Sequence, residues 1–172
     1  HKSCPTYTLL DNDSLNADTL IIDFGSSNCL VYGKLRKGKI YVVFTGKYAD
    51  PGTEIYTSFD NYHVNENNIM GLRKVTNNGI NSQGNIEFTI EVTQGTVILS
   101  NNQGAIDWES TRTREWIEGS NTQSLSDDKY LITGNSNGIS RNGTPFSITI
   151  SNPILADLDC LLNQNKCLLT SG

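Results

Sequence analysis

The chain is poor in the features that build helices and membrane spans. It has one methionine against 15 glycines in 172 residues, a composition that favours turns over helices. No run approaches the roughly 20 consecutive apolar residues of a transmembrane helix, so we expect no transmembrane segment. The abrupt start at His1-Lys2-Ser3-Cys4 is typical of a processed chain. We therefore expect any signal segment or lipid anchor to lie upstream of the chain.

A surplus of basic residues is also missing. The formal net charge is −5 at pH 7. Binding to nucleic acid depends on clustered lysines and arginines that displace counterions from phosphates, so the acidic balance argues against a nucleic-acid partner. The same charge weighs against binding to an anionic membrane surface.

The four cysteines are not spaced as the ligands of a metal site usually are. Cys4, Cys29, Cys160 and Cys167 lie near the two ends of the chain and form no CxxC pair. Disulfides are favoured, and they indicate an oxidising compartment. The pairings Cys4–Cys29 and Cys160–Cys167 are preferred to the crossed ones because each closes a local loop. The first would contribute roughly 3–4 kcal/mol through chain entropy. Four reduced, buried thiols are the alternative.

The chain contains instead a series of alternating apolar segments bounded by Gly and Asn. The clearest is residues 86–92, where Ile86, Phe88, Ile90 and Val92 share one face. The short Asn/Gly connections are typical of hairpins, and no crossover helix is needed. We predict a single all-β domain over residues 1–172, an antiparallel meander of about ten strands curled into a sandwich or an open barrel.

Turn residues predict several strand boundaries. Gln94-Gly95 is expected to be a turn, residues 76–85 a polar loop, and Pro153 the end of the last strand. A helical turn is expected only within residues 154–162. The segment 40–44 is apolar on both faces, which predicts a central strand covered on both sides.

Several phrases occur in a fixed order along most of the chain. They are residues 19–25 followed by Asn28-Cys29, residues 36–40 running to Thr45-Gly46, residues 59–62 with Val64-Asn65, then Gly71, residues 75–77 and residues 113–117. This series resembles a family of secreted or lipid-anchored all-β proteins of Bacteroidetes that has no established function. The resemblance implies a periplasmic, outer-membrane-anchored or secreted location, and it implies no activity. It departs at the chain end, where a short tail follows Cys167, and this leaves the Cys160–Cys167 pairing open.

Residues 105–117 concentrate aromatic and cationic side chains. Alternation places Trp108, Arg112, Arg114 and Trp116 on one face of the predicted strand. Tryptophan offers a stacking plane and arginine a planar fork for a carboxylate or sulfate, so this face is the candidate binding site. The alternative is a structural strand with its tryptophans at the core and its arginines paired to glutamates on neighbouring strands.

Two tyrosines are candidate partners of that face. Tyr56 and Tyr62 belong to the predicted strand 54–62, where alternation places them on one face together with Ser58 and Asp60.

No catalytic constellation is recognisable, and we expect neither enzymatic activity nor a cofactor. The carboxylates are scattered over several strands, whereas a glycosidase needs two facing each other across a cleft. His63 is the only internal histidine, and no serine lies in a Gly-x-Ser-x-Gly context. Asp11, Asp13 and Asp18 fail the EF-hand pattern, so an acidic turn is favoured over a calcium loop and no metal site is predicted.

The predicted function is therefore non-enzymatic binding, in which the chain acts as a binding or adhesion module for a glycan or for an envelope or host protein. The alternative is a carrier or chaperone that holds an apolar ligand such as a lipid in a half-open barrel, for which segment 40–44 is the support. A third, structural role would join the domain to a fibre through an exposed edge strand. The sequence leaves the ligand and the oligomeric state open.

Overall fold

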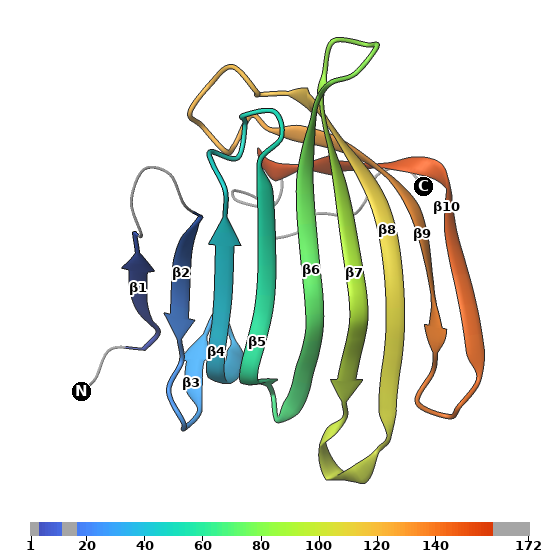
Figure 1. Cartoon of the computed structure of the whole chain (residues 1–172). Coiled ribbons are helices and arrows are strands. Elements are labelled where there is room, and N and C mark those ends of the chain that lie inside the picture. The colour runs from blue at the N-terminus through green and yellow to red at the C-terminus, as the bar shows by residue number, and fades with distance from the viewer. Residues whose placement is uncertain (1–3, 12–16, 160–172) are drawn as a thin grey trace.

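The computed structural model describes residues 4–11 and 17–159, and their strands form one antiparallel sheet. Spatial order follows chain order, β1-β2-β4-β5-β6-β7-β8-β9-β10, with β3 paired to β4 (Figure 1). The strands are β1 (Thr6–Leu10), β2 (Asp18–Asp23), β3 (Cys29–Val31), β4 (Lys34–Phe44), β5 (Glu54–Val64), β6 (Asn67–Ile80), β7 (Ile86–Ile98), β8 (Ala105–Glu118), β9 (Lys129–Ile139) and β10 (Pro145–Asp157), and the 3-10 turn η1 (Ser100–Asn102) joins β7 to β8. The predicted antiparallel meander is confirmed, in an open form with β1 and β10 at its two edges.

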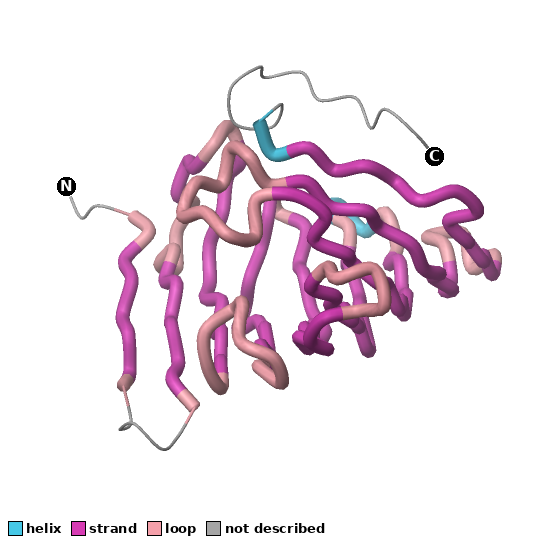
Figure 2. Tube along the Cα trace, turned by 90° about the horizontal axis from the view of Figure 1, so that it is seen from above, coloured by secondary structure: helices cyan, strands magenta, loops and turns pink. Residues whose placement is uncertain are grey.

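The sheet is strongly curled, as the view from above shows (Figure 2). Register shifts interrupt the pairing of strands β4 through β10 with their neighbours. Each extra residue at such a bulge bends the strand and increases its twist. At the C-terminal end, β10 bends between Ile150 and Ile154, and its last part crosses the upper ends of the central strands on their inner side.

The inner face of this curl carries two separate hydrophobic clusters. The upper cluster is built on Phe88, Trp116 and Tyr130 with Val75 and Ile90, and Tyr48 and Ala156 pack against it. The lower cluster is built on Phe24, Cys29 and Tyr62. Phe88 is completely buried, which stabilises the fold by about 2–3 kcal/mol through removal of its ring from water.

The predicted turn at Gln94-Gly95 is wrong, because residues 86–98 form a single strand. The two residues lie where the register between β7 and β8 shifts, so they form a bulge rather than a hairpin turn. A Cβ atom on Gly95 would lie 2.9 Å from Cε2 of Trp108. Glycine is required there because the indole of the neighbouring strand covers the backbone.

Two other predicted boundaries are corrected in the same way. The expected loop 76–85 is in part strand, since β6 continues to Ile80 past a bulge near Gly79. Pro153 does not end the last strand, because it lies in the bulge of an edge strand, where a missing N–H is tolerated. The expected helical turn is confined to residues 158–159 within the described chain, and residues 160–162 lie outside it.

The segment 40–44 lies in β4, and its central position is confirmed by pairing with both β2 and β5. Its predicted cover on both sides is wrong. The strands of the described chain make a single layer, and Tyr41 and Val43, which alternate onto the outer face, are only half-buried. One face of β4 packs inside the curl, and the other is screened by side chains of adjacent strands alone.

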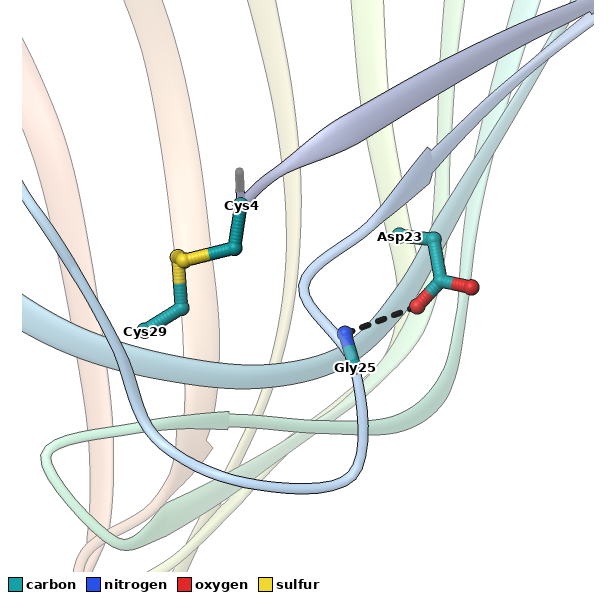
Figure 3. The surroundings of a disulfide bond; sticks show 4 residues. All are labelled: Cys4, Asp23, Gly25 and Cys29. Carbon is teal, nitrogen blue, oxygen red and sulfur yellow. Dashed lines mark hydrogen bonds between the residues drawn. A yellow bond between two sulfur atoms is a disulfide. The ribbon is translucent and has the colours of Figure 1, made fainter. Parts of the chain in front are cut away.

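A disulfide ties the N-terminal edge to the sheet. Cys4 and Cys29 are bonded, which confirms that predicted pairing, and Figure 3 shows Asp23 beside them accepting a hydrogen bond of 2.8 Å from the backbone N–H of Gly25. The bond connects the segment before β1 to the first residue of β3. Cys160 and Cys167, the other predicted pair, lie outside the described residues.

Candidate functional site

The four side chains predicted to share one face of β8 do so. Trp108, Arg112, Arg114 and Trp116 stand opposite residues of β7 that line the inner side of the curl, among them Phe88. The face is therefore enclosed by the curl rather than displayed on the outside of the protein. Its upper half, with Arg114 and Trp116, and its lower half, with Trp108 and Arg112, have different surroundings.

The upper half belongs to the core. Trp116 is 8% exposed, and its Nε1 donates a hydrogen bond of 3.1 Å to Oδ1 of Asp128. The hydroxyl of Tyr130 donates a second bond of 3.1 Å to Oδ2 of the same carboxylate. These contacts satisfy a carboxylate that is 1% exposed. Trp116 is thus a structural residue, as the alternative interpretation of this strand held.

Arg114 lies among aromatic rings rather than beside a carboxylate. Its guanidinium carbon lies 5.5, 5.3 and 5.0 Å from the ring centroids of Tyr48, Phe88 and Tyr130. Its Nη2 donates a hydrogen bond to the hydroxyl of Tyr48, while its buried Nε has no partner in the described chain. Cation–π contacts of this kind replace the pairing with glutamates that the sequence suggested.

The lower half lines a cavity of about 400 Å³ between β8 and β10. Its aromatic lining comes from Trp108 and its polar lining from Arg112, Asn135 and Ser136. Its aliphatic lining is supplied by four isoleucines, Ile132, Ile148, Ile150 and Ile154. Ile148 is 58% exposed although it lies on the inner face. Gly134 also belongs to this lining, and a Cβ atom there would lie 2.3 Å from the carbonyl oxygen of Thr111 and 2.6 Å from Cα of Arg112. Glycine therefore allows the backbones of β8 and β9 to approach closely beside the cavity.

A third arginine belongs to the same face. Arg73 of β6 pairs with Val92, whose partner on β8 is Ser110 of the inner face. Burial lowers the pKa of Arg73, and the charges of Arg114 and Arg112 lower it further. The guanidinium group of Arg73 is therefore close enough to those of Arg112 and Arg114 to be repelled by both.

The two tyrosines are not brought to this site. Asn61 has a φ of 47° in the region where the β5–β6 register shifts, and this irregularity ends the simple alternation that placed Tyr56 and Tyr62 together. Tyr62 is buried in the lower cluster. Tyr56 lies on the outer face, where its hydroxyl donates a 2.6 Å hydrogen bond to Glu54 and Lys74 stands 5.4 Å from its ring centroid.

The sequence interpretation missed Arg73 and the isoleucines of β10 as site residues. A signal was present, because Phe146, Ile148 and Ile150 alternate in the sequence. Alternation identifies a face but not what the face encloses. The register of the strands in the sheet is what places Arg73 of β6 and the isoleucines of β10 on the same face as Arg112 of β8.

Residues 4–11 and 17–159 contain no group of three or more His, Cys, Asp or Glu side chains placed to hold a metal ion. Asp13, one of the three acids weighed as a calcium loop, lies outside these residues. In the same part of the chain, no helix has the length and apolar character to cross a membrane.

Comparison with known proteins yields no match to a family model, to a curated protein or to a solved structure.

Proposed function

We propose that this chain is a non-enzymatic binding protein that carries a ligand with an apolar portion inside the curl of its sheet. The observation that supports this most directly is the cavity of about 400 Å³ whose apolar lining comes from isoleucines of β9 and β10. Apolar pockets with a few polar groups are typical of small-molecule sites. Of the functions considered from the sequence, the geometry favours the carrier.

Two of the four β8 residues predicted to form an adhesion surface pack in the core instead. Trp116 and Arg114 are engaged by Asp128 and Tyr48, so a flat glycan or protein surface would meet only Trp108 and Arg112. A glycan remains a second candidate ligand for one reason. Trp108 and exposed Arg112 line the same cavity, and together they would suit the ring and the carboxylate of an acidic sugar.

A non-enzymatic role is supported by the placement of the carboxylates. Glu87, Glu91, Glu109 and Glu115 alternate onto the outer face, away from the cavity. Asp128 reaches the inner side, but Trp116 and Tyr130 occupy both of its oxygens.

We propose an extracytoplasmic location as well. The Cys4–Cys29 disulfide supports an oxidising compartment, and the resemblance to secreted or lipid-anchored Bacteroidetes proteins agrees with it.

The carrier function is tested by measuring dye binding and by extracting any ligand that is purified with the protein. The neutral dye N-phenyl-1-naphthylamine should fluoresce when it binds the protein, and organic extraction of freshly purified protein should release a molecule identifiable by mass spectrometry. Ile148→Ser should weaken dye binding several-fold with little change in melting temperature, because this side chain is 58% exposed.

Ile98→Ser is the matched control. Ile98 is 43% exposed and lies on the outer face of β7, two residues beyond Thr96. Equal loss of dye binding in the two variants would place the dye elsewhere and contradict the proposal. Absence of dye binding to the unmodified protein, with nothing extracted, would also contradict it.

A further inference from the structure

The three arginines of the inner face differ in how far their charges are already engaged. Arg114 is held by Tyr48 and by three aromatic rings. Arg73 and Arg112 make neither a hydrogen bond nor an ion pair with any residue in 4–11 or 17–159, since the four ion pairs there all use lysines. Their guanidinium groups are therefore available to a ligand.

Among the described residues, no acid stands beside Arg73 and Arg112 on this part of the inner face. The glutamates of β7 and β8 and Asp107 stand in register on the outer face. On the inner side, Asp128 lies in the upper half with Trp116 and Tyr130, and Asp18 lies away on β2, opposite Phe44 of β4. The cavity end of the curl is therefore cationic although the chain as a whole has a net charge of −5.

Arg73 and Arg112 flank β7 from its two sides. Arg73 is in register with Val92, and Arg112 is in register with Ile90, two residues away on β7. One intervening strand and an offset of two residues separate their Cα atoms by about 12 Å, a span that two long arginine side chains can close around one anion. A cation that is partly buried without a partner is unfavourable unless a counter-charge joins it.

A buried hydroxyl beside them points to a ligand independently. Ser110 lies between Trp108 and Arg112 on the inner face of β8 and is 5% exposed. Its Oγ has no hydrogen-bond partner in the described part of the chain. Buried polar groups are rarely left unpaired, so this hydroxyl is suited to donate to an acceptor atom that the protein itself does not supply.

We infer that the cavity takes an amphipathic anion. Its alkyl chain would lie along Ile148, Ile150 and Ile154. Its carboxylate, phosphate or sulfate group would be bound by Arg112, which lines the cavity, and by Arg73, which lies outside the lining on the same inner face. This inference rests on the carrier function proposed above and names its ligand class. The positive charge of the arginines would favour an anionic head group, and the apolar lining of β10 would favour an alkyl chain.

Decanoate and decanol separate the two parts of the inference, because they share one chain length and differ in charge. Competition with N-phenyl-1-naphthylamine at pH 7.5 should show decanoate binding at least tenfold more tightly than decanol. In the double variant Arg73→Gln/Arg112→Gln this advantage should disappear, while decanol binds as before. Arg141→Gln, at an exposed arginine between β9 and β10, should retain the full advantage. Raising the salt concentration should weaken decanoate alone.

The outcomes distinguish the two proposals. Equal binding of decanoate and decanol to the unmodified protein would overturn the anionic ligand and leave the carrier function standing. Displacement of decanoate by inorganic phosphate at equal concentration would show a site for small anions only, and so overturn the role of the alkyl chain. Failure of both decyl compounds and of the dye to bind would overturn the carrier function itself. Circular dichroism of each variant establishes that lost binding is not lost folding.

Discussion

Arg114 of β8 and Tyr48 of the β4–β5 connection, 66 residues apart in the chain, are joined by a hydrogen bond from the guanidinium to the tyrosine hydroxyl. The Tyr48 ring also stacks on Phe88, with their centroids 4.5 Å apart. The pair thus fastens a loop onto the inner face of strands that follow much later in the sequence. It also divides that face into a filled upper half and an open lower half.

Replacement of Arg114 should destabilise the fold. Arg114→Met removes the hydrogen bond to Tyr48 and the cation–π contacts while retaining a long side chain, so we expect the free energy of unfolding to fall by about 2–3 kcal/mol. Arg112→Met, at an exposed position of the same strand, should change it by less than about 0.5 kcal/mol. Urea unfolding of both variants provides the measurement. Equal stability of the two variants would show that the ring contacts of Arg114 contribute nothing.

The disulfide should stabilise the N-terminal edge locally. The bond closes a loop with a sequence separation of 25, and chain entropy predicts that Cys4→Ala/Cys29→Ala lowers the free energy of unfolding by roughly 3 kcal/mol. Hydrogen exchange should accelerate more in β1 and β3 than in β6–β8, because the edge also opens locally, whereas the core strands exchange through global unfolding. Uniform acceleration over all strands would contradict a local role.

Stability should fall in alkaline solution because of buried tyrosines. Burial raises the pKa of Tyr130, and the proximity of Tyr48 and a hydrogen bond to Asp128 raise it further. The folded state therefore keeps a proton that the unfolded state loses near pH 10, so stability is complete below that pH and declines as the pH rises above it. The unmodified protein should lose about 1 kcal/mol more than Tyr130→Phe between pH 10 and pH 11. Parallel losses in urea unfolding at these two pH values would contradict this origin.

Gly138 should not tolerate a side chain. A Cβ atom there would lie 2.1 Å from the carbonyl oxygen of Asp107 and 2.8 Å from Cζ of Phe146. Because the first clash is with backbone, Gly138→Ala should cost about 2–3 kcal/mol and open the β8–β9 pairing beside the cavity. Gly143→Ala, whose Cβ atom meets nothing within 4 Å, should cost only about 1 kcal/mol from its positive φ. Thermal unfolding of the two variants compares these costs, and a reversed order would refute the steric account.

Local patterns succeeded where the structure depends on neighbouring residues only. The shared face of Trp108, Arg112, Arg114 and Trp116 follows from a period of two, and no bulge interrupts that stretch of β8. The same reasoning failed at Tyr62, because a bulge near Asn61 changes the parity of alternation. It failed at Gln94-Gly95 because glycine is as typical of a bulge as of a turn.

Alternation and turn residues predicted the antiparallel strands, and short cysteine spacing favoured the Cys4–Cys29 disulfide, because these signals act over short distances. The order of the strands in the sheet came from the structure. Which side chains of the inner face are buried, and which line a cavity, follows from how the sheet curls. The curl places Tyr48 and Asp128 over the upper half of β8, so Arg114 and Trp116 serve the core. It leaves the lower half lined by Arg112 and the isoleucines of β10 around a cavity. Whether a side chain is buried depends on segments distant in sequence, and alternation carries no information about them.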